Sequence, residues 1–263
     1  MMTAKALGGS ALWSGMPFTA GCLPAIKTGR SFAIGWEMYL QDNQRYWERG
    51  YTAPNVDSSL FRFYGRILKP DFPQLRGKRL VDFGCGQGAS VNFLHKVGFD
   101  VVGVDSSSTD IEAGRALFPH VANRLELCDI DPGKVPYYGF ADNVAIVTAV
   151  QSLYYLDDDH FEICLRKLAD AMEPGGVFYA TMMGTRCDEF YKNSTPAAGG
   201  LRKVDFRNDR IQVSDYYMSF IEDEDHLKRK FHLFKPLHIG YYAARFREDE
   251  GDGFHYTFCG IKE

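Results

Sequence analysis

Strand and helix patterns alternate along the middle of the chain, and this alternation restricts the fold more than any other feature of the sequence. The expected strands are Arg79–Phe83, Asp100–Val104, Arg124–Leu127, Asn143–Ala149 and Val177–Met182, and the expected helices between them are Ala89–Val97, Ile111–Phe118 and Asp157–Met172. Strands that alternate with helices form parallel sheets, because each helix crosses over a face of the sheet. We therefore expect an α/β fold with a doubly wound, mostly parallel sheet and helices on both faces.

Four segments differ in character and suggest a domain organisation. Residues 1–36 contain no acidic residue and three basic ones, which is typical of a flexible N-terminal extension. Residues 37–75 are rich in aromatic residues at helical spacing and predict a helical cap. Residues 76–263 carry the strand and helix pattern, ending in two strands near Phe234–Phe246 and Phe254–Ile261. Within them, about 183–220 has poor periodicity and predicts a lid or substrate insertion.

Composition disfavours several partners. The chain has 30 Lys and Arg against 34 Asp and Glu, so it lacks the basic excess that binds nucleic acid. No apolar run approaches the roughly 18 residues that span a bilayer. The six cysteines and seven histidines show no metal-ligand spacing, so we expect no metal, reduced thiols and a cytoplasmic protein.

The most specific motif is a strand that breaks into three glycines and then begins a helix. Gly84, Gly86 and Gly88 follow the strand that contains Asp82, with Cys85 between the first two. Glycine allows a tight turn and lets the backbone approach a ligand. Asp105 ends the next strand, about 20 residues on, where a carboxylate accepts hydrogen bonds from ribose hydroxyls. The two features together predict an adenosine site.

The string from Leu80 to Gly88, with its h-D-h-G-C-G-x-G pattern, closely resembles motif I of class I S-adenosylmethionine-dependent methyltransferases. The resemblance continues in order as far as Met183. It implies a Rossmann-like seven-stranded sheet with an antiparallel C-terminal strand, and S-adenosyl-L-methionine as cofactor with S-adenosyl-L-homocysteine as product. The implied cofactor-binding residues are Asp82, Gly84, Cys85, Gly86, Gly88, Asp105, Ser106, Asp129, Ile130, Val150 and Gln151.

Two alternatives stay open. Gly84, Gly86 and Ala89 also satisfy the G-x-G-x-x-G/A pattern of NAD(P)-dependent oxidoreductases, although no Y-x-x-x-K pair occurs in the chain. A non-catalytic cofactor-binding module would share the same fold.

The acceptor is expected to be a small molecule, such as a metabolite or a sugar-like compound, methylated on an O or N atom. Alignment of the two reactants can supply most of the catalysis, so no obligatory catalytic residue is expected. Tyr154 and His160 are the candidate proton acceptors at the pocket edge. The candidate substrate-binding residues are Tyr39, Trp47, Tyr51, Tyr155, Tyr191 and Tyr216. The chain is expected to be a monomer or a homodimer.

Overall fold

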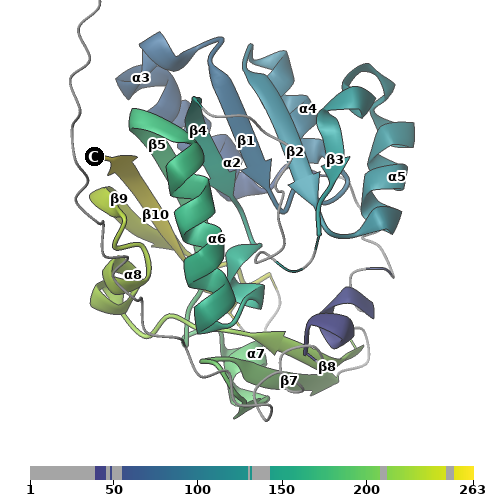
Figure 1. The fold of residues 1–263 in the computed structure, drawn as a ribbon. Coiled ribbons are helices and arrows are strands. Elements are labelled where there is room, and N and C mark those ends of the chain that lie inside the picture. Colours follow the sequence, from purple (N-terminus) through teal and green to yellow (C-terminus); the bar gives the residue numbers. More distant parts are fainter. Residues whose placement is uncertain are drawn as a thin grey trace, which may run out of the picture.

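The computed structural model describes residues 39–45, 48, 55–129, 131, 143–207, 212–246 and 252–263. Its large sheet consists of β1 (Arg79–Phe83), β2 (Asp100–Asp105), β3 (Leu125–Leu127), β4 (Val144–Ala149), β5 (Met172–Met183), β9 (Phe234–Tyr242) and β10 (His255–Lys262). The strand order is β3-β2-β1-β4-β5-β10-β9 (Figure 1). β1 to β5 pair in parallel, and β10 is antiparallel to both of its neighbours. The expected mostly parallel sheet with an antiparallel C-terminal strand is confirmed.

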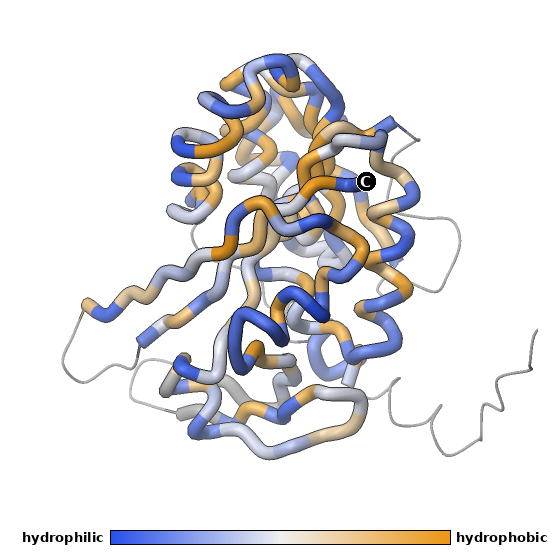
Figure 2. The backbone as a smooth tube through the Cα atoms, turned by 90° about the vertical axis from the view of Figure 1, so that its left-hand side faces the viewer, coloured by the Kyte–Doolittle hydropathy of each residue, from blue (hydrophilic) through white to orange (hydrophobic). Residues whose placement is uncertain are grey.

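Helices cover both faces of this sheet, because successive strand residues point to opposite sides. On one face, α2 (Ser58–Phe63), α4 (Ala89–Lys96) and α5 (Ser108–Leu117) pack on a core that includes Leu80, Val101 and Ile146. On the other, α6 (Asp158–Ala171) and α8 (Glu224–Lys230) pack on a core that includes Val147 and Phe178. Figure 2 shows hydrophobic residues concentrated along the strands, whereas hydrophobic and hydrophilic residues alternate along the surrounding helices. The fold is therefore doubly wound.

Helix α6 lies where the sequence predicts it, but its end differs from the expectation. The Asp157 side chain caps it by accepting a hydrogen bond from the backbone N–H of His160 at 2.8 Å. The helix ends at Ala171, and β5 begins at once at Met172 instead of at Val177. The Pro-Gly-Gly sequence lies inside β5, where the pairing with β4 shifts register. Residues 173–176 lie between the pairs Met172–Val144 and Val177–Ile146 and form an irregularity there, with a φ of 80° at Gly175.

The segment expected to be an insertion has regular structure of its own. It contains α7 (Asp188–Lys192) and an antiparallel sheet of β6 (Ser194–Pro196), β7 (Arg202–Arg207) and β8 (Gln212–Met218). This small sheet lies below the carboxyl ends of the parallel strands, next to the helical residues 39–45 (Figure 1). Among the residues that the structure describes, no helix is long and apolar enough to cross a membrane.

Candidate active site

The three glycines after β1 differ in what surrounds them. All have positive φ, of 73° at Gly84, 51° at Gly86 and 78° at Gly88. A Cβ added at Gly84 would lie 2.2 Å from Ser152 Cβ, and one at Gly88 would lie 2.7 Å from Leu125 Cδ2. A Cβ at Gly86 would meet no atom within 4 Å. Packing accounts for the first and third glycines, whereas Gly86 faces open space, as a ligand-binding backbone does.

The carboxylate that ends β2 points toward this loop. Asp105 Oδ2 accepts a hydrogen bond from the backbone N–H of Gly86 at 2.8 Å, and Oδ1 accepts one from the N–H of Ser107 at 2.9 Å. Burial raises the pKa of the Asp105 carboxyl to about 6, against the effect of these hydrogen bonds. The side chain of Ser107 caps α5, so Asp105 is not its cap. Its position instead places a carboxylate beside the open face of Gly86, with Ser106 next to it.

Asp82 and Cys85 lie deeper in the same region. Asp82 is 3% exposed, and its carboxylate accepts a hydrogen bond from Thr148 Oγ1 at 2.6 Å. Burial raises the pKa of Asp82 to about 7. The Cys85 side chain packs on Gly103, where an added Cβ would lie 2.8 Å from Cys85 Cβ. Burial raises the pKa of its thiol, so Cys85 contributes an inert side chain and its backbone to the loop.

The residues after β4 border the glycine loop. Ser152 Oγ donates a hydrogen bond to the carbonyl oxygen of Phe83 at 2.8 Å. Gln151 is exposed and has a φ of 53°, a conformation rare for a residue with a side chain. Its N–H donates to Thr181 Oγ1 at 2.8 Å, and the half-buried Val150 precedes it. Val150 and Gln151 therefore lie at the same edge of the sheet as Gly84.

Asp129 is an exposed residue just after β3, and its carboxylate accepts a hydrogen bond from the N–H of Asp131 at 2.9 Å. Ile130 lies outside the described residues, as do Trp47, Tyr51 and residues 1–36.

Three polar residues of the N-terminal segment that the sequence analysis did not single out connect three parts of this edge. Asn43 is fully buried and exchanges hydrogen bonds with the backbone of Tyr217, as donor at 3.0 Å and as acceptor at 2.9 Å. Gln44 Nε2 donates to the carbonyl oxygen of Ser106 at 3.2 Å. Glu48 accepts hydrogen bonds from the N–H groups of Ser108 and Thr109 at 3.1 Å each, which caps α5. No pattern in the sequence marks these partners, since they lie 60 or more residues away.

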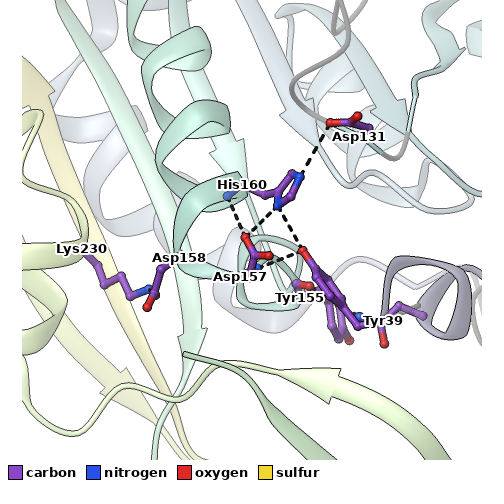
Figure 3. Close-up of polar contacts among 8 residues, drawn as sticks. Tyr39, Asp131, Tyr155, Asp157, Asp158, His160 and Lys230 are labelled. Carbon is purple, nitrogen blue, oxygen red and sulfur yellow. Dashed lines mark hydrogen bonds and ion pairs between the residues drawn. The ribbon is translucent and has the colours of Figure 1, made fainter. Parts of the chain in front are cut away.

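His160 lies in a polar cluster at the start of α6 (Figure 3). Its Nδ1 is 2.7 Å from Asp157 Oδ1 and 3.4 Å from the hydroxyl of Tyr39, and its Nε2 is 3.8 Å from Asp131 Oδ1. Burial by itself would lower the pKa of His160, but the hydrogen bond and charge of Asp157 and the charge of Asp131 outweigh it and raise the pKa. Burial, with the charge of Asp157, raises the pKa of Tyr39.

Three of the predicted pocket tyrosines form one buried group. The Tyr216 hydroxyl donates to that of Tyr155, which donates to that of Tyr154 at 3.5 Å. Tyr191 lies elsewhere, beneath the Arg202 guanidinium, in a cavity of about 320 Å³ between the small sheet and α8. The structure thus brings Tyr154, Tyr155 and Tyr216 together and separates Tyr191 from them.

Comparisons with known proteins identify the family. A family model described as a methyltransferase domain matches residues 55–242. The chain belongs to the methyltransferase family. The expected resemblance to the class I S-adenosylmethionine-dependent enzymes is thereby confirmed. This match favours the interpretation of the three glycines as a methyltransferase motif over their interpretation as an NAD(P)-binding pattern.

The individual relatives of this methyltransferase have low sequence identity to it or match only part of its length. It is 30% identical over 125 residues to a ubiquinone biosynthesis O-methyltransferase from a Chelativorans species; the match covers 46% of this chain and 45% of that relative. The CcbJ methyltransferase from Streptomyces caelestis has a similar fold, with a TM-score of 0.57, 15% identity and coverage of 86% and 99% of the two chains. A magnesium protoporphyrin IX methyltransferase from Synechocystis with bound SAM has a TM-score of 0.53, 12% identity and coverage of 89% and 92%.

The residues present fit the cofactor that this family uses. Gly86 offers an open backbone surface, and the Asp105 carboxylate beside it keeps lone pairs for two ribose hydroxyls. Within the described part of the chain, no three His, Cys, Asp or Glu side chains gather as metal ligands. That observation does not test the expectation of a metal-free enzyme, which stays a prediction.

Proposed function

We propose that this methyltransferase moves the methyl group of S-adenosylmethionine to an O or N atom of a small-molecule acceptor, and that it acts in the cytoplasm. One observation carries the cofactor part: the Asp105 carboxylate and the N–H of Gly86, 2.8 Å apart, lie beside open space at the carboxyl ends of β1 and β2. When bound, the cofactor supplies a methyl carbon activated by a positively charged sulfur. The methionine end would lie toward Val150 and Gln151, and the adenine toward Asp129.

The chain's main contribution would be to hold the acceptor in line and to exclude water. Residues 39–45 and the small sheet lie across the carboxyl edge of the parallel strands, and Asn43 joins the two. Such a covered edge suits a small molecule better than a polymer, in line with the formal charge of −4. The similarity to a ubiquinone biosynthesis O-methyltransferase favours oxygen as the acceptor atom.

Two groups are proposed to take up the acceptor's proton. Against the effect of burial, the neighbouring carboxylates raise the pKa of His160, which favours uptake of a proton by its ring. Tyr154 belongs to the row of three buried hydroxyls and is the second candidate base. The variants His160→Asn and Tyr154→Phe would separate these roles. Replacement of the residue that acts as the base should lower kcat and shift the pH profile of kcat without weakening cofactor binding.

Calorimetry with S-adenosylhomocysteine tests the proposal, since the product shares the adenosyl and amino acid groups. We expect saturable binding at one site per chain. No binding at millimolar concentration would refute it. Binding without methyl transfer to a panel of hydroxylated and amino compounds, followed by mass spectrometry, would favour a non-catalytic module.

A further inference from the structure

His255 lies at the carboxyl edge of the sheet, beyond β4 and away from the glycine loop. It is the first residue of β10 and pairs with Met183 at the end of β5 and with Tyr242 at the end of β9. The residue is 7% exposed, and its ring stacks on that of Tyr242, with centroids 5.1 Å apart and planes within 3°. The Tyr154 ring is 6.0 Å away. The sequence contains no spacing that singles out this histidine.

The hydrogen bonds of His255 define which ring nitrogen is basic. Nδ1 is 3.2 Å from the carbonyl oxygen of Gly253, which can only accept, so Nδ1 carries the proton. Nε2 then has a free lone pair, and it is buried without a hydrogen-bond partner. Burial lowers the pKa of the ring, which keeps it neutral. An unpaired buried acceptor is unfavourable and rare in folded proteins. Nε2 is therefore a strong hydrogen-bond acceptor in need of a donor.

We propose that His255 is an acceptor-binding residue, whose Nε2 accepts a hydrogen bond from a hydroxyl or N–H group on an aromatic methyl acceptor. The rings of Tyr242 and Tyr154 lie 5.1 and 6.0 Å from the His255 ring, centroid to centroid, so the histidine has aromatic neighbours of the kind that suit a flat ligand. Gln151, from the segment that borders the glycine loop, donates to the Tyr242 hydroxyl at 3.3 Å and so connects the two regions.

The strand order places His255 several strands away from the Asp105 carboxylate that ends β2. β2 and β10 are separated by β1, β4 and β5, which is four strand spacings or roughly 19 Å. An adenosyl group at β2 and an acceptor at β10 would thus meet over the middle strands. This inference rests on the proposed function, because it assumes that the adenosyl group occupies the glycine loop.

Nitrogen NMR of the full chain tests the inference. The protein is labelled with ¹⁵N-histidine, saturated with S-adenosylhomocysteine and titrated with phenol, and in parallel with benzene, which lacks the hydroxyl. We expect phenol to shift the resonance of the unprotonated His255 Nε2 saturably and benzene to leave it in place. A resonance that phenol does not move overturns the inference.

Matched variants give a second readout. In His255→Asn the shorter amide can keep the bond to Gly253 but lacks Nε2, so phenol should bind about tenfold more weakly. In His255→Gln the amide oxygen can reach the place of Nε2, and phenol binding should stay within about threefold. His238→Asn changes an exposed histidine of β9 and serves as control. Equal phenol affinity in the Asn and Gln variants contradicts the inference. Failure to bind S-adenosylhomocysteine refutes the proposed function instead.

Discussion

Replacement of Asp105 by Asn tests the adenosine site most directly, because it keeps the shape of the side chain and removes its charge. Asn retains one oxygen, which can accept from the N–H of Gly86 or from that of Ser107, and it loses the other of these two bonds because its NH2 group only donates. Hydrogen bonds to a charged group contribute about 1.5–3 kcal/mol, against about 0.5–1.5 kcal/mol for neutral pairs. With two ribose hydroxyls affected, we expect a loss of roughly 1.5–3 kcal/mol, or about 10- to 150-fold in affinity for S-adenosylhomocysteine.

The pKa of Asp105 adds a pH dependence with a definite sign. Its pKa is about 6 without ligand, and ribose hydroxyls bind the ionised form. Affinity should therefore be full at pH 8 and fall below pH 6, by about tenfold at pH 5, because the carboxyl must first lose a proton. Asp105→Asn should lack this fall. The difference between the two proteins isolates Asp105 from other titrating groups.

Calorimetry at pH 5 and pH 8 measures both effects. Asp100→Asn is the matched control, because Asp100 begins the same strand at its opposite end and pairs with Arg124 at the surface. It should bind with unchanged affinity at both pH values. If Asp105→Asn binds within threefold of the unchanged protein at pH 8, Asp105 does not hold the ribose.

Three further predictions, with four substitutions, probe the fold and the site. Asp82→Asn should stabilise the protein. The rise of the Asp82 pKa from 3.8 to about 7 on folding corresponds to a loss of about 4 kcal/mol in stability above pH 7, and this loss disappears below pH 4. Urea unfolding should therefore show a higher free energy of unfolding for the variant at pH 8.5 and almost no difference at pH 4. Gly86→Ala should cost only about 1–2 kcal/mol of stability, because of the positive φ at this position, yet weaken the binding of S-adenosylhomocysteine at least tenfold. Gly84→Ala should lower the melting temperature much more, because its Cβ meets Ser152. Equal melting temperatures of the two variants would contradict this contrast. Glu48→Gln should loosen residues 39–45 from α5 and speed tryptic cleavage after Arg45, and an unchanged rate would show that the cap does not hold them.

The sheet was predictable because its signals are local. The central parallel strands β1 and β4 are short runs that are buried on both faces. Helix α6 has one apolar face, with Phe161, Leu165 and Leu168. The irregular start of β5 was not predictable from the Pro-Gly-Gly sequence. There Met172 pairs with Val144 and Val177 pairs with Ile146, so residues 173–176 lie outside the ladder, and this register depends on the position of β4.

The small sheet of the insertion escaped prediction for a related reason. β7 and β8 are joined by residues outside the described part, and β8 alternates poorly in polarity. Their pairing with one another, and the bonds of Asn43 to Tyr217, are long-range contacts that no local pattern encodes.

In the candidate site, too, some features could be predicted from the sequence and others only from the tertiary structure. The glycine spacing and the position of Asp105 can be predicted from local sequence patterns. A turn with positive φ needs glycine, and a strand ends where its apolar run ends. The roles of Gly84 and Gly86 differ only through what lies opposite them, Ser152 for one and open space for the other. The unpaired Nε2 of His255 likewise emerges only when β9 and β10 fold back beside β5. Residue type and spacing specify backbone conformation, whereas burial and unpaired polar atoms depend on which distant segments the fold brings together.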